Sequence, residues 1–226
     1  MIHLERKDWK DCEVSEIQDY LKSLTVQQDE AFCSVNQAKQ FTEYARRSTC
    51  GRCVICREGI LQSALIIKDI TEGKGKDGDL AILSELAENL KAGSICDYGK
   101  TVGEMLQSML DAGYDDFEKH LKRKRCDALV CKEYISYHIL GDKCTGCGEC
   151  KVACPNGAIE GDAGLIHVIS LSNCNKCGDC MKVCTSSAIT KAGAIKPKTP
   201  EKPIPVGTFK PAGLGGGLLS RRRRSQ

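Results

Sequence analysis

Residues 143–160 read KCTGCGECKVACPNGAIE, and residues 173–190 read NCNKCGDCMKVCTSSAIT. Each stretch has four cysteines spaced C-x2-C-x2-C-x3-C and continues to the same Ala-Ile pair, so the second repeats the first. Four thiolates this close in sequence cannot satisfy disulfide geometry among themselves, whereas they can surround a cubane of iron and sulfide. The repeat therefore predicts a module that binds two 4Fe-4S clusters.

The fourth cysteine of each run is expected to ligate the cluster of the other run, because this spacing crosses over in two-cluster proteins. One predicted ligand set is Cys144, Cys147, Cys150 and Cys184, and the other is Cys154, Cys174, Cys177 and Cys180. Glycines between the ligands let backbone amides face sulfur and tune the potential. The stretch resembles bacterial two-cluster ferredoxins, except that Thr185 replaces Pro155, which we expect to loosen one turn.

The composition favours metal ligation over disulfides. The chain has 16 cysteines in 226 residues, with no secretory signal and no apolar run long enough for a membrane span. Such usage indicates a reducing cytoplasm. Aromatic residues make up only 5% of the chain, so metal centres are expected to replace part of the hydrophobic core.

Charge is distributed unevenly along the chain. The net charge is +3, but residues 191–226 contain nine Lys and Arg against one acid, which leaves residues 1–190 with −5. Residues 193–226, with five of the six prolines and the run Arg221–Arg224, are expected to form an extended, disordered basic tail. The acidic body argues against general nucleic-acid binding, and a strap onto an acidic partner is the favoured use of the tail.

A third cysteine run lies upstream, where residues 49–59 read TCGRCVICREG. A helical pattern from Ser34 leads into it, two further helical patterns follow, and the second ends at GSICDYG, residues 93–99. A cubane needs a fourth thiolate, and Cys96, just after the second helical pattern, supplies it. The predicted ligands of a third 4Fe-4S cluster are Cys50, Cys53, Cys56 and Cys96. The alternative is a zinc site on the same four thiolates.

This region resembles the C-terminal helical bundle of the NADH- and FMN-binding flavoprotein subunit of respiratory complex I and of iron-only hydrogenases. The resemblance implies a cluster that takes electrons from FMN. Ile55 stands where that family usually has proline. No glycine-rich NADH and FMN domain precedes the bundle, so we expect no flavin or NAD site in this chain.

Four cysteines remain outside the three cluster motifs. Cys126 and Cys131 lie close to His120, and an imidazole with two thiolates suits tetrahedral zinc if one more thiolate arrives. Cys33 is a better fourth ligand than Cys12, which has no second ligand near it in sequence and is expected to be a plain thiol. Hydrogenase-type relatives resemble the chain here, which implies a structural zinc on Cys33, His120, Cys126 and Cys131. Unligated buried cysteines are the alternative.

These assignments predict an α+β protein with five regions. Residues 1–33 form an N-terminal segment that could dock on a partner, and residues 34–125 form the helical bundle with one cluster, its last helix spanning 101–125. Residues 126–140 form a zinc-pinned hinge with a strand at Tyr134–Ile139. Residues 141–192 form the ferredoxin-like domain with its central strands at Leu165–Leu171, and 193–226 form the tail.

The function predicted from these motifs is electron transfer without a substrate site in the chain. The chain would relay electrons through three 4Fe-4S clusters between flavin-bearing subunits of a cytosolic oxidoreductase, linked to NAD(P)H and to ferredoxin in a way compatible with electron bifurcation. Expected partners are an NAD(P)H-binding flavoprotein, soluble ferredoxin, and a hydrogenase, formate dehydrogenase or flavin-dependent reductase component. The alternative is a redox-sensing regulator that uses its basic tail.

Overall fold

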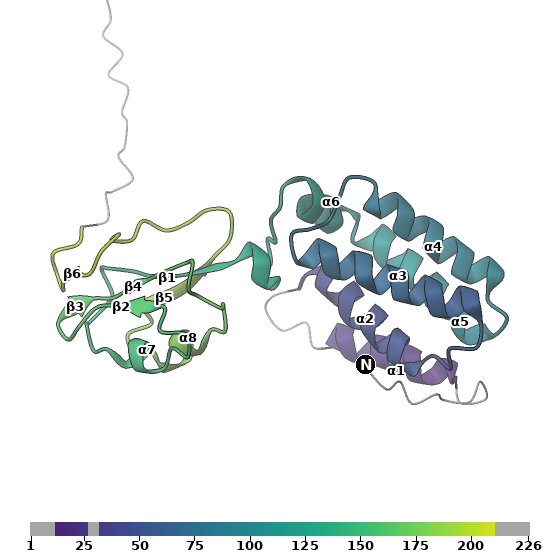
Figure 1. The fold of residues 1–226 in the computed structure, drawn as a ribbon, viewed down its shortest axis with the longest axis horizontal. Coiled ribbons are helices and arrows are strands. Elements are labelled where there is room, and N and C mark those ends of the chain that lie inside the picture. The colour runs from purple at the N-terminus through teal and green to yellow at the C-terminus, as the bar shows by residue number, and fades with distance from the viewer. Residues whose placement is uncertain (1–11, 27–31, 211–226) are drawn as a thin grey trace, which may run out of the picture. The chain divides into compact units, whose positions relative to one another are not determined.

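A computed structural model describes residues 12–26 and 32–210 (Figure 1). The chain divides into two compact units, one up to Ile135 and the other from Ser136. The first is helical, and the second combines short helices with short antiparallel strands. The α+β class predicted from the sequence is confirmed.

The first unit is a bundle of α-helices in which α2 to α5 lie side by side (Figure 1). Its apolar positions recur at helical spacing, and residues such as Phe41, Ile67, Leu83 and Leu106 are fully buried. The helices are α1 (Val14–Val26), α2 (Ser34–Ser48), α3 (Val54–Thr71), α4 (Asp79–Gly93), α5 (Asp97–Ala112) and α6 (Tyr114–Lys122).

The close packing of α4 against α5 depends on Gly103. A Cβ atom there would lie 2.7 Å from the Ala87 carbonyl oxygen and 2.8 Å from the Lys91 backbone nitrogen. Because backbone atoms cannot move aside cheaply, only glycine allows α4 and α5 to pack this closely. This contact places the start of α5, where Cys96 lies, beside the end of α4.

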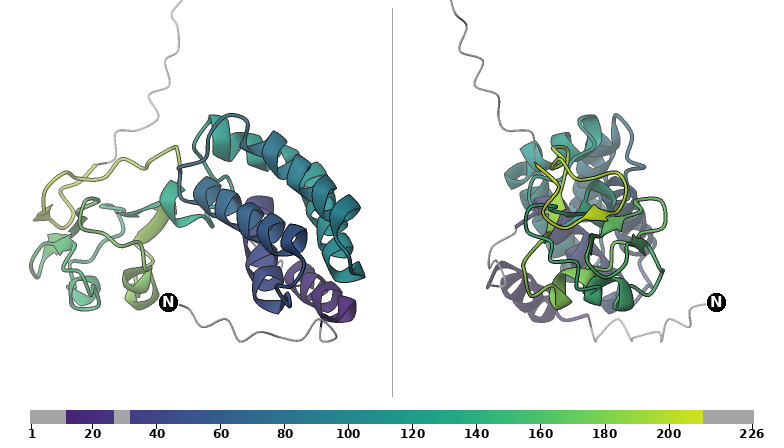
Figure 2. Two further views of the ribbon diagram at one scale, coloured as in Figure 1. Left: turned by 45° about the vertical axis from the view of Figure 1, so that its right-hand side comes forward. Right: turned by 90° about the vertical axis from the view of Figure 1, so that its left-hand side faces the viewer.

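Two sequence predictions for the bundle are corrected. The predicted helix 101–125 is two helices separated at Gly113, where a Cβ would lie 2.6 Å from the Ser34 Cβ. The predicted boundary between the N-terminal segment, residues 1–33, and the bundle is also corrected, because that segment contributes α1 to the bundle. Its Ile17 is fully buried in the core, and α1 lies along α2 (Figure 2). Residues 1–11 and 27–31 lie outside the described residues.

The second unit is built from three two-stranded antiparallel pairs and two short helices, α7 (Glu149–Val152) and α8 (Asp179–Val183), which lie on the same side of the strands (Figure 1). Strand β1 (Ser136–Ile139) pairs with β5 (Ile189–Ala192), with Ser136 opposite Ala192. Strand β2 (Ile159–Glu160) pairs with β4 (Val168–Ile169). The predicted strand at Leu165–Leu171 is therefore interrupted at His167, and the first strand begins at Ser136 because a 3-10 turn, η2 (Lys132–Tyr134), precedes it.

The predicted disordered tail is wrong for residues 193–210. Strand β6 (Ile204–Pro205) pairs with β3 (Leu165–Ile166), with Ile166 opposite Ile204. Phe209 packs over Gly141, where an added Cβ would lie 2.6 Å from its ring. The run Arg221–Arg224 lies outside the described residues. In the part of the chain that the structure describes, no helix is long and apolar enough to cross a membrane.

Candidate iron-sulfur and metal centres

The four predicted bundle ligands come from the helix ends at the junctions α2–α3 and α4–α5. Cys50 lies in the turn after α2, Cys53 is the N-cap of α3, and Cys56 is in the first turn of α3. Cys96 is the N-cap of α5. Helix N-termini present free backbone N–H groups and positive dipole ends, so two of them here suit an anionic group.

Hydrogen-bond donors surround these thiols. Burial alone would raise the pKa of the Cys53 thiol, but backbone N–H groups of Cys56 and Ile95 hold that pKa below its usual value. Burial raises the pKa of the Cys56 thiol to about 11. The Thr49 hydroxyl lies 3.5 Å from Cys56 Sγ. A sulfur that accepts several hydrogen bonds is stabilised as a thiolate, which is the form that binds metal.

A buried hydroxyl beside Cys56 lacks a partner among the described residues. Ser94 Oγ is buried without a hydrogen bond. At Gly99, an added Cβ would lie 2.4 Å from this oxygen and 3.2 Å from Cys56 Sγ, so the glycine lets the Ser94 hydroxyl and the Cys56 thiol both lie close to α5. Buried hydroxyls normally have an acceptor. The sulfides of a 4Fe-4S cluster would supply one, so the residues present fit the predicted group.

Cys12 also lies at this site, which the sequence analysis did not foresee. The backbone N–H of Cys50 donates to Cys12 Sγ at 3.1 Å. Burial, and to a smaller degree the Cys50 and Cys96 thiols, raise the pKa of Cys12 to about 12. The spacing of Val14, Ile17, Leu21 and Leu24, typical of a helix packed on a core, was the one sequence signal for its placement.

In the second unit, the two cysteine runs form matching structures. Cys150 lies in α7 and Cys180 lies in α8, and each helix begins after a left-handed glycine, Gly148 or Gly178. Burial, and to a smaller degree thiolates that include Cys144, Cys147, Cys180 and Cys184, raise the pKa of Cys150 to about 11. Burial, and to a smaller degree thiolates that include Cys174, Cys177 and Cys154, raise the pKa of Cys180 to about 11. Thiols of both runs therefore lie close enough to Cys150 and to Cys180 for their charges to act on them.

Thr185 does not loosen its turn, contrary to the sequence prediction. The N–H of Ser187 donates to the Cys184 carbonyl at 3.2 Å, and the N–H of Gly157 donates to the Cys154 carbonyl at the same distance. The turn is held by this hydrogen bond, so losing the proline ring does not open it.

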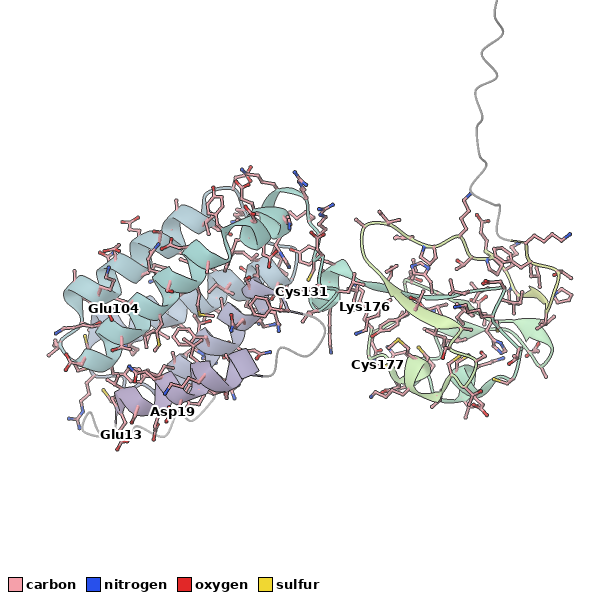
Figure 3. The ribbon with its side chains drawn as sticks, turned by 180° about the vertical axis from the view of Figure 1, so that it is seen from behind. Glu13, Asp19, Glu104, Cys131, Lys176 and Cys177 are labelled. Carbon is pink, nitrogen blue, oxygen red and sulfur yellow. The ribbon has the colours of Figure 1, made fainter. Side chains whose placement is uncertain are left out.

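A polar ring lies beside the glycine that precedes each short helix. A Cβ at Gly178 would lie 2.7 Å from the Tyr137 hydroxyl, and one at Gly148 would lie 4.0 Å from His167 Nε2. His167, predicted as a packing residue, is buried, and its Nε2 has no hydrogen-bond partner among the described residues. Cys147 and Cys177 are exposed, as Figure 3 shows for Cys177 near α8.

The four predicted zinc ligands are brought together at one end of the bundle. Cys33 is the N-cap of α2, His120 lies on α6, and Cys126 and Cys131 follow α6, with Cys131 labelled in Figure 3. All four side chains are buried, and their ligand atoms lie within 4.8 Å of one another. Cys33 Sγ is 3.6 Å from His120 Nε2 and 3.8 Å from Cys131 Sγ.

These distances fit one tetrahedral ion. Zn–S bonds of about 2.3 Å and Zn–N bonds of about 2.0 Å place neighbouring ligand atoms roughly 3.5–3.8 Å apart. The Nδ1–H of His120 donates to the Asp116 carbonyl at 2.7 Å, because a carbonyl can only accept. In the neutral imidazole, Nε2 therefore carries the lone pair, and it lies 3.6 Å from Cys33 Sγ, which is the arrangement that a metal-bound histidine uses.

The same cluster binds a proton tightly without metal. Burial would lower the pKa of His120, but hydrogen bonds to Cys126 and Cys33 raise it to about 10. Hydrogen bonds from Cys131 and Cys33 hold the pKa of Cys126 far below its usual value. The site thus stabilises negative charge on sulfur beside a cation, a role that a divalent metal would take over.

Comparisons with known proteins agree with the two motif regions. Residues 36–120 match the model of the NADH-ubiquinone oxidoreductase-F iron-sulfur binding region, and residues 143–188 match that of the 4Fe-4S dicluster domain. The chain joins these two iron-sulfur regions. The predicted resemblance to the complex I and hydrogenase bundle, fused to a two-cluster ferredoxin domain, is confirmed.

The relatives are oxidoreductase subunits. The chain is 38% identical over 133 residues to the HndC subunit of the NADP-reducing hydrogenase of Solidesulfovibrio fructosivorans, which covers 59% of the chain and 27% of that relative. It is 32% identical over 98 residues to the F subunit of the NADH-quinone oxidoreductase of Streptomyces coelicolor, which covers 43% of the chain and 22% of that relative. It is 28% identical over 102 residues to the corresponding F subunit of Escherichia coli, which covers 45% of the chain and 23% of that relative. The chain thus spans about a quarter of the length of these relatives.

Proposed function

We propose that the chain is an electron-transfer subunit that holds three 4Fe-4S clusters. The observation that carries this proposal is the match of residues 36–120 and 143–188 to two iron-sulfur binding regions, which contain the three cysteine motifs of the sequence. The bundle set is Cys50, Cys53, Cys56 and Cys96. The ferredoxin sets are Cys144, Cys147, Cys150 and Cys184, and Cys154, Cys174, Cys177 and Cys180.

The protein's own part in this function is binding and tuning. A 4Fe-4S cluster supplies one-electron redox chemistry. The thiolates hold it, and the N–H groups that donate to Cys53, Cys154 and Cys184 stabilise the added negative charge of the reduced state. Buried Cys150 and Cys180 keep water from one side of each ferredoxin site, whereas exposed Cys147 and Cys177 leave the other side accessible to a redox partner.

We propose flavoprotein subunits as the partners, one of them binding NAD(P)H, in a cytoplasmic complex. The names of the relatives, an NADP-reducing hydrogenase subunit and an NADH-quinone oxidoreductase subunit, support this choice. Apolar side chains at the bundle site also support it, because Val54, Ile55 and Ile95 are 61%, 43% and 84% exposed beside the predicted ligands. Soluble ferredoxin, a hydrogenase, a formate dehydrogenase or a flavin-dependent reductase would complete an electron-bifurcating assembly.

We further propose a structural zinc on Cys33, His120, Cys126 and Cys131. Four protein ligands close the coordination sphere, which is typical of structural and not catalytic zinc. Such an ion would tie the start of α2 and the last turn of α6 to residues 126–131, the segment that ends the first unit. The tetrahedral fit of the ligand distances supports it.

An anaerobic redox titration of the full chain, followed by electron paramagnetic resonance, tests the electron-transfer proposal. Three separate one-electron centres are expected, each reversibly reduced. Purification from the native source tests the partner proposal, and a flavoprotein should be recovered with the chain. A chain that shows no reversible reduction, or one isolated alone, would overturn the corresponding proposal.

A further inference from the structure

The loops that follow Cys154 and Cys184 have the same backbone. In each, the N–H three residues after the cysteine donates to its carbonyl at 3.2 Å, and the N–H four residues after it donates to its sulfur at 3.3 Å. The left-handed residue is Gly157, with a φ of 60°, in the first loop and Ser187, with a φ of 49°, in the second. The N–H groups of Ala158 and Ala188 therefore contact the two sulfurs in the same way.

The side chains two residues after Cys154 and Cys184 differ between the two loops. Ser186 Oγ lies half-buried, 3.5 Å from Cys184 Sγ. Asn156, at the matching position, is exposed, and it accepts from Asn175 Nδ2 at 3.3 Å and donates to the Asn173 carbonyl at 3.4 Å. No hydrogen bond found in the described residues joins Asn156 to Cys154. Among the hydrogen bonds found in the described residues, a hydroxyl contacts Cys184 Sγ and none contacts Cys154 Sγ.

The direction of the Ser186 contact follows from the chemistry of a metal ligand. A thiolate bound to iron carries no proton, so the sulfur can only accept and the hydroxyl must donate. Reduction adds negative charge to the cluster and its sulfurs, and a donor stabilises the reduced form more than the oxidised form. A hydroxyl on Cys184 therefore favours reduction of the cluster that Cys184 ligates.

We propose that Ser186 raises the reduction potential of the cluster held by Cys144, Cys147, Cys150 and Cys184. It leaves the potential of the other ferredoxin cluster unchanged. This inference rests on the proposed function, since it uses the proposed ligand sets. It distinguishes the two sites of the dicluster domain, because this donor shifts the electron toward the site that Ser186 contacts.

Three variants of the full chain test this inference by anaerobic redox titration. Ser186→Ala removes the donor and should lower one midpoint potential of the dicluster domain, leaving the other and that of the bundle centre in place. Ser186→Thr keeps a hydroxyl and should retain the original value. Asn156→Ala removes the matching side chain and should change neither potential. Tyr137 lies beside one ferredoxin site and His167 beside the other, and neither residue is changed in any variant.

Unchanged potentials in Ser186→Ala, or an equal fall at both sites, would overturn the inference. Iron and sulfide content is measured first, so that a chain without two ferredoxin clusters contradicts the proposed function and not the role of Ser186. Should Ser186→Ala lose a cluster, pulsed magnetic resonance of the unmutated chain in D2O replaces the comparison. Stronger coupling to exchangeable hydrogens at one reduced site is then expected, and equal coupling at both would overturn the inference.

Discussion

The bundle contains two four-ligand sites of opposite character. The Cys33–His120–Cys126–Cys131 site is fully buried, and its ligand atoms face one another at distances that suit a single ion. At the Cys50–Cys53–Cys56–Cys96 site, three of the four thiols are half-buried, two of the cysteines are helix N-caps, and the nearby Ser94 hydroxyl has no hydrogen-bond partner among the described residues. A single ion needs only its ligands, whereas a cluster also has sulfides that accept hydrogen bonds. The difference in surroundings therefore indicates which group each site holds.

Among the tests of this comparison, removal of one bundle ligand should have the largest effect on metal content. Cys96→Ala is expected to lower the iron content by about four atoms per chain, because a cubane needs four ligands. The zinc content should stay near one. Cys12→Ala is the matched control, since Cys12 lies beside the site without being one of the four proposed ligands, and iron should remain at the original level. Equal iron loss in both variants would contradict the ligand assignment.

Removal of a zinc ligand should destabilise the fold with the iron sites intact. Cys131→Ala is expected to lose the zinc and several kcal/mol of unfolding free energy, because metal binding is coupled to folding at closed sites. Thermal unfolding and metal content of the anaerobic protein measure this. A variant that keeps its zinc and its Tm would show that Cys131 is not a zinc ligand.

Acid should weaken zinc binding specifically. The pKa of His120 in the metal-free site is raised to about 10, mainly through hydrogen bonds to Cys126 and Cys33 acting against burial. Below that pH a proton occupies the imidazole and must leave before zinc binds, so apparent affinity should fall at least about tenfold for each pH unit from 9 to 6. Chelator competition at several pH values measures the slope. An affinity independent of pH would exclude His120 as a ligand.

The smallest expected effect is at Ser94. Ser94→Ala removes the hydroxyl beside Cys56 and should lower the potential of the bundle cluster without changing iron content. Ser63→Ala is the matched control, because the buried Ser63 hydroxyl donates to the Gly59 carbonyl at 2.8 Å and not to sulfur. Redox titration compares the two variants, and the same shift in both would assign the effect to packing.

Sequence reasoning succeeded where the signal was local. The three cysteine motifs and the helical spacing of residues such as Val35, Ala38 and Phe41 predicted the two regions and most of the bundle helices. The order of α4 and α5 brought Cys96 back to the first cysteine run, as expected from its place after a helical hairpin. Cys33 is predicted as the fourth ligand beside His120, Cys126 and Cys131, and its Sγ lies 3.6 Å from His120 Nε2.

Features that depend on distant contacts could not be predicted. Cys12 meets Cys50 across 38 positions, and only the packing of α1 on the bundle creates that contact. Strand β6 pairs through only two residues of a proline-rich stretch. Such a stretch lacks the alternation of apolar and polar residues that predicts a strand. The break at Gly113 arises from its contact with Ser34, a residue of another helix. The unpartnered Ser94 hydroxyl is visible only once its surroundings are known.

Metal analysis of the full chain, prepared without oxygen, tests the central claim most directly. Three cubanes and one closed tetrahedral site predict about twelve iron atoms, about twelve acid-labile sulfides and about one zinc per chain. About eight irons with two zincs would place zinc at the Cys50–Cys53–Cys56–Cys96 site and contradict the distinction between the two bundle sites.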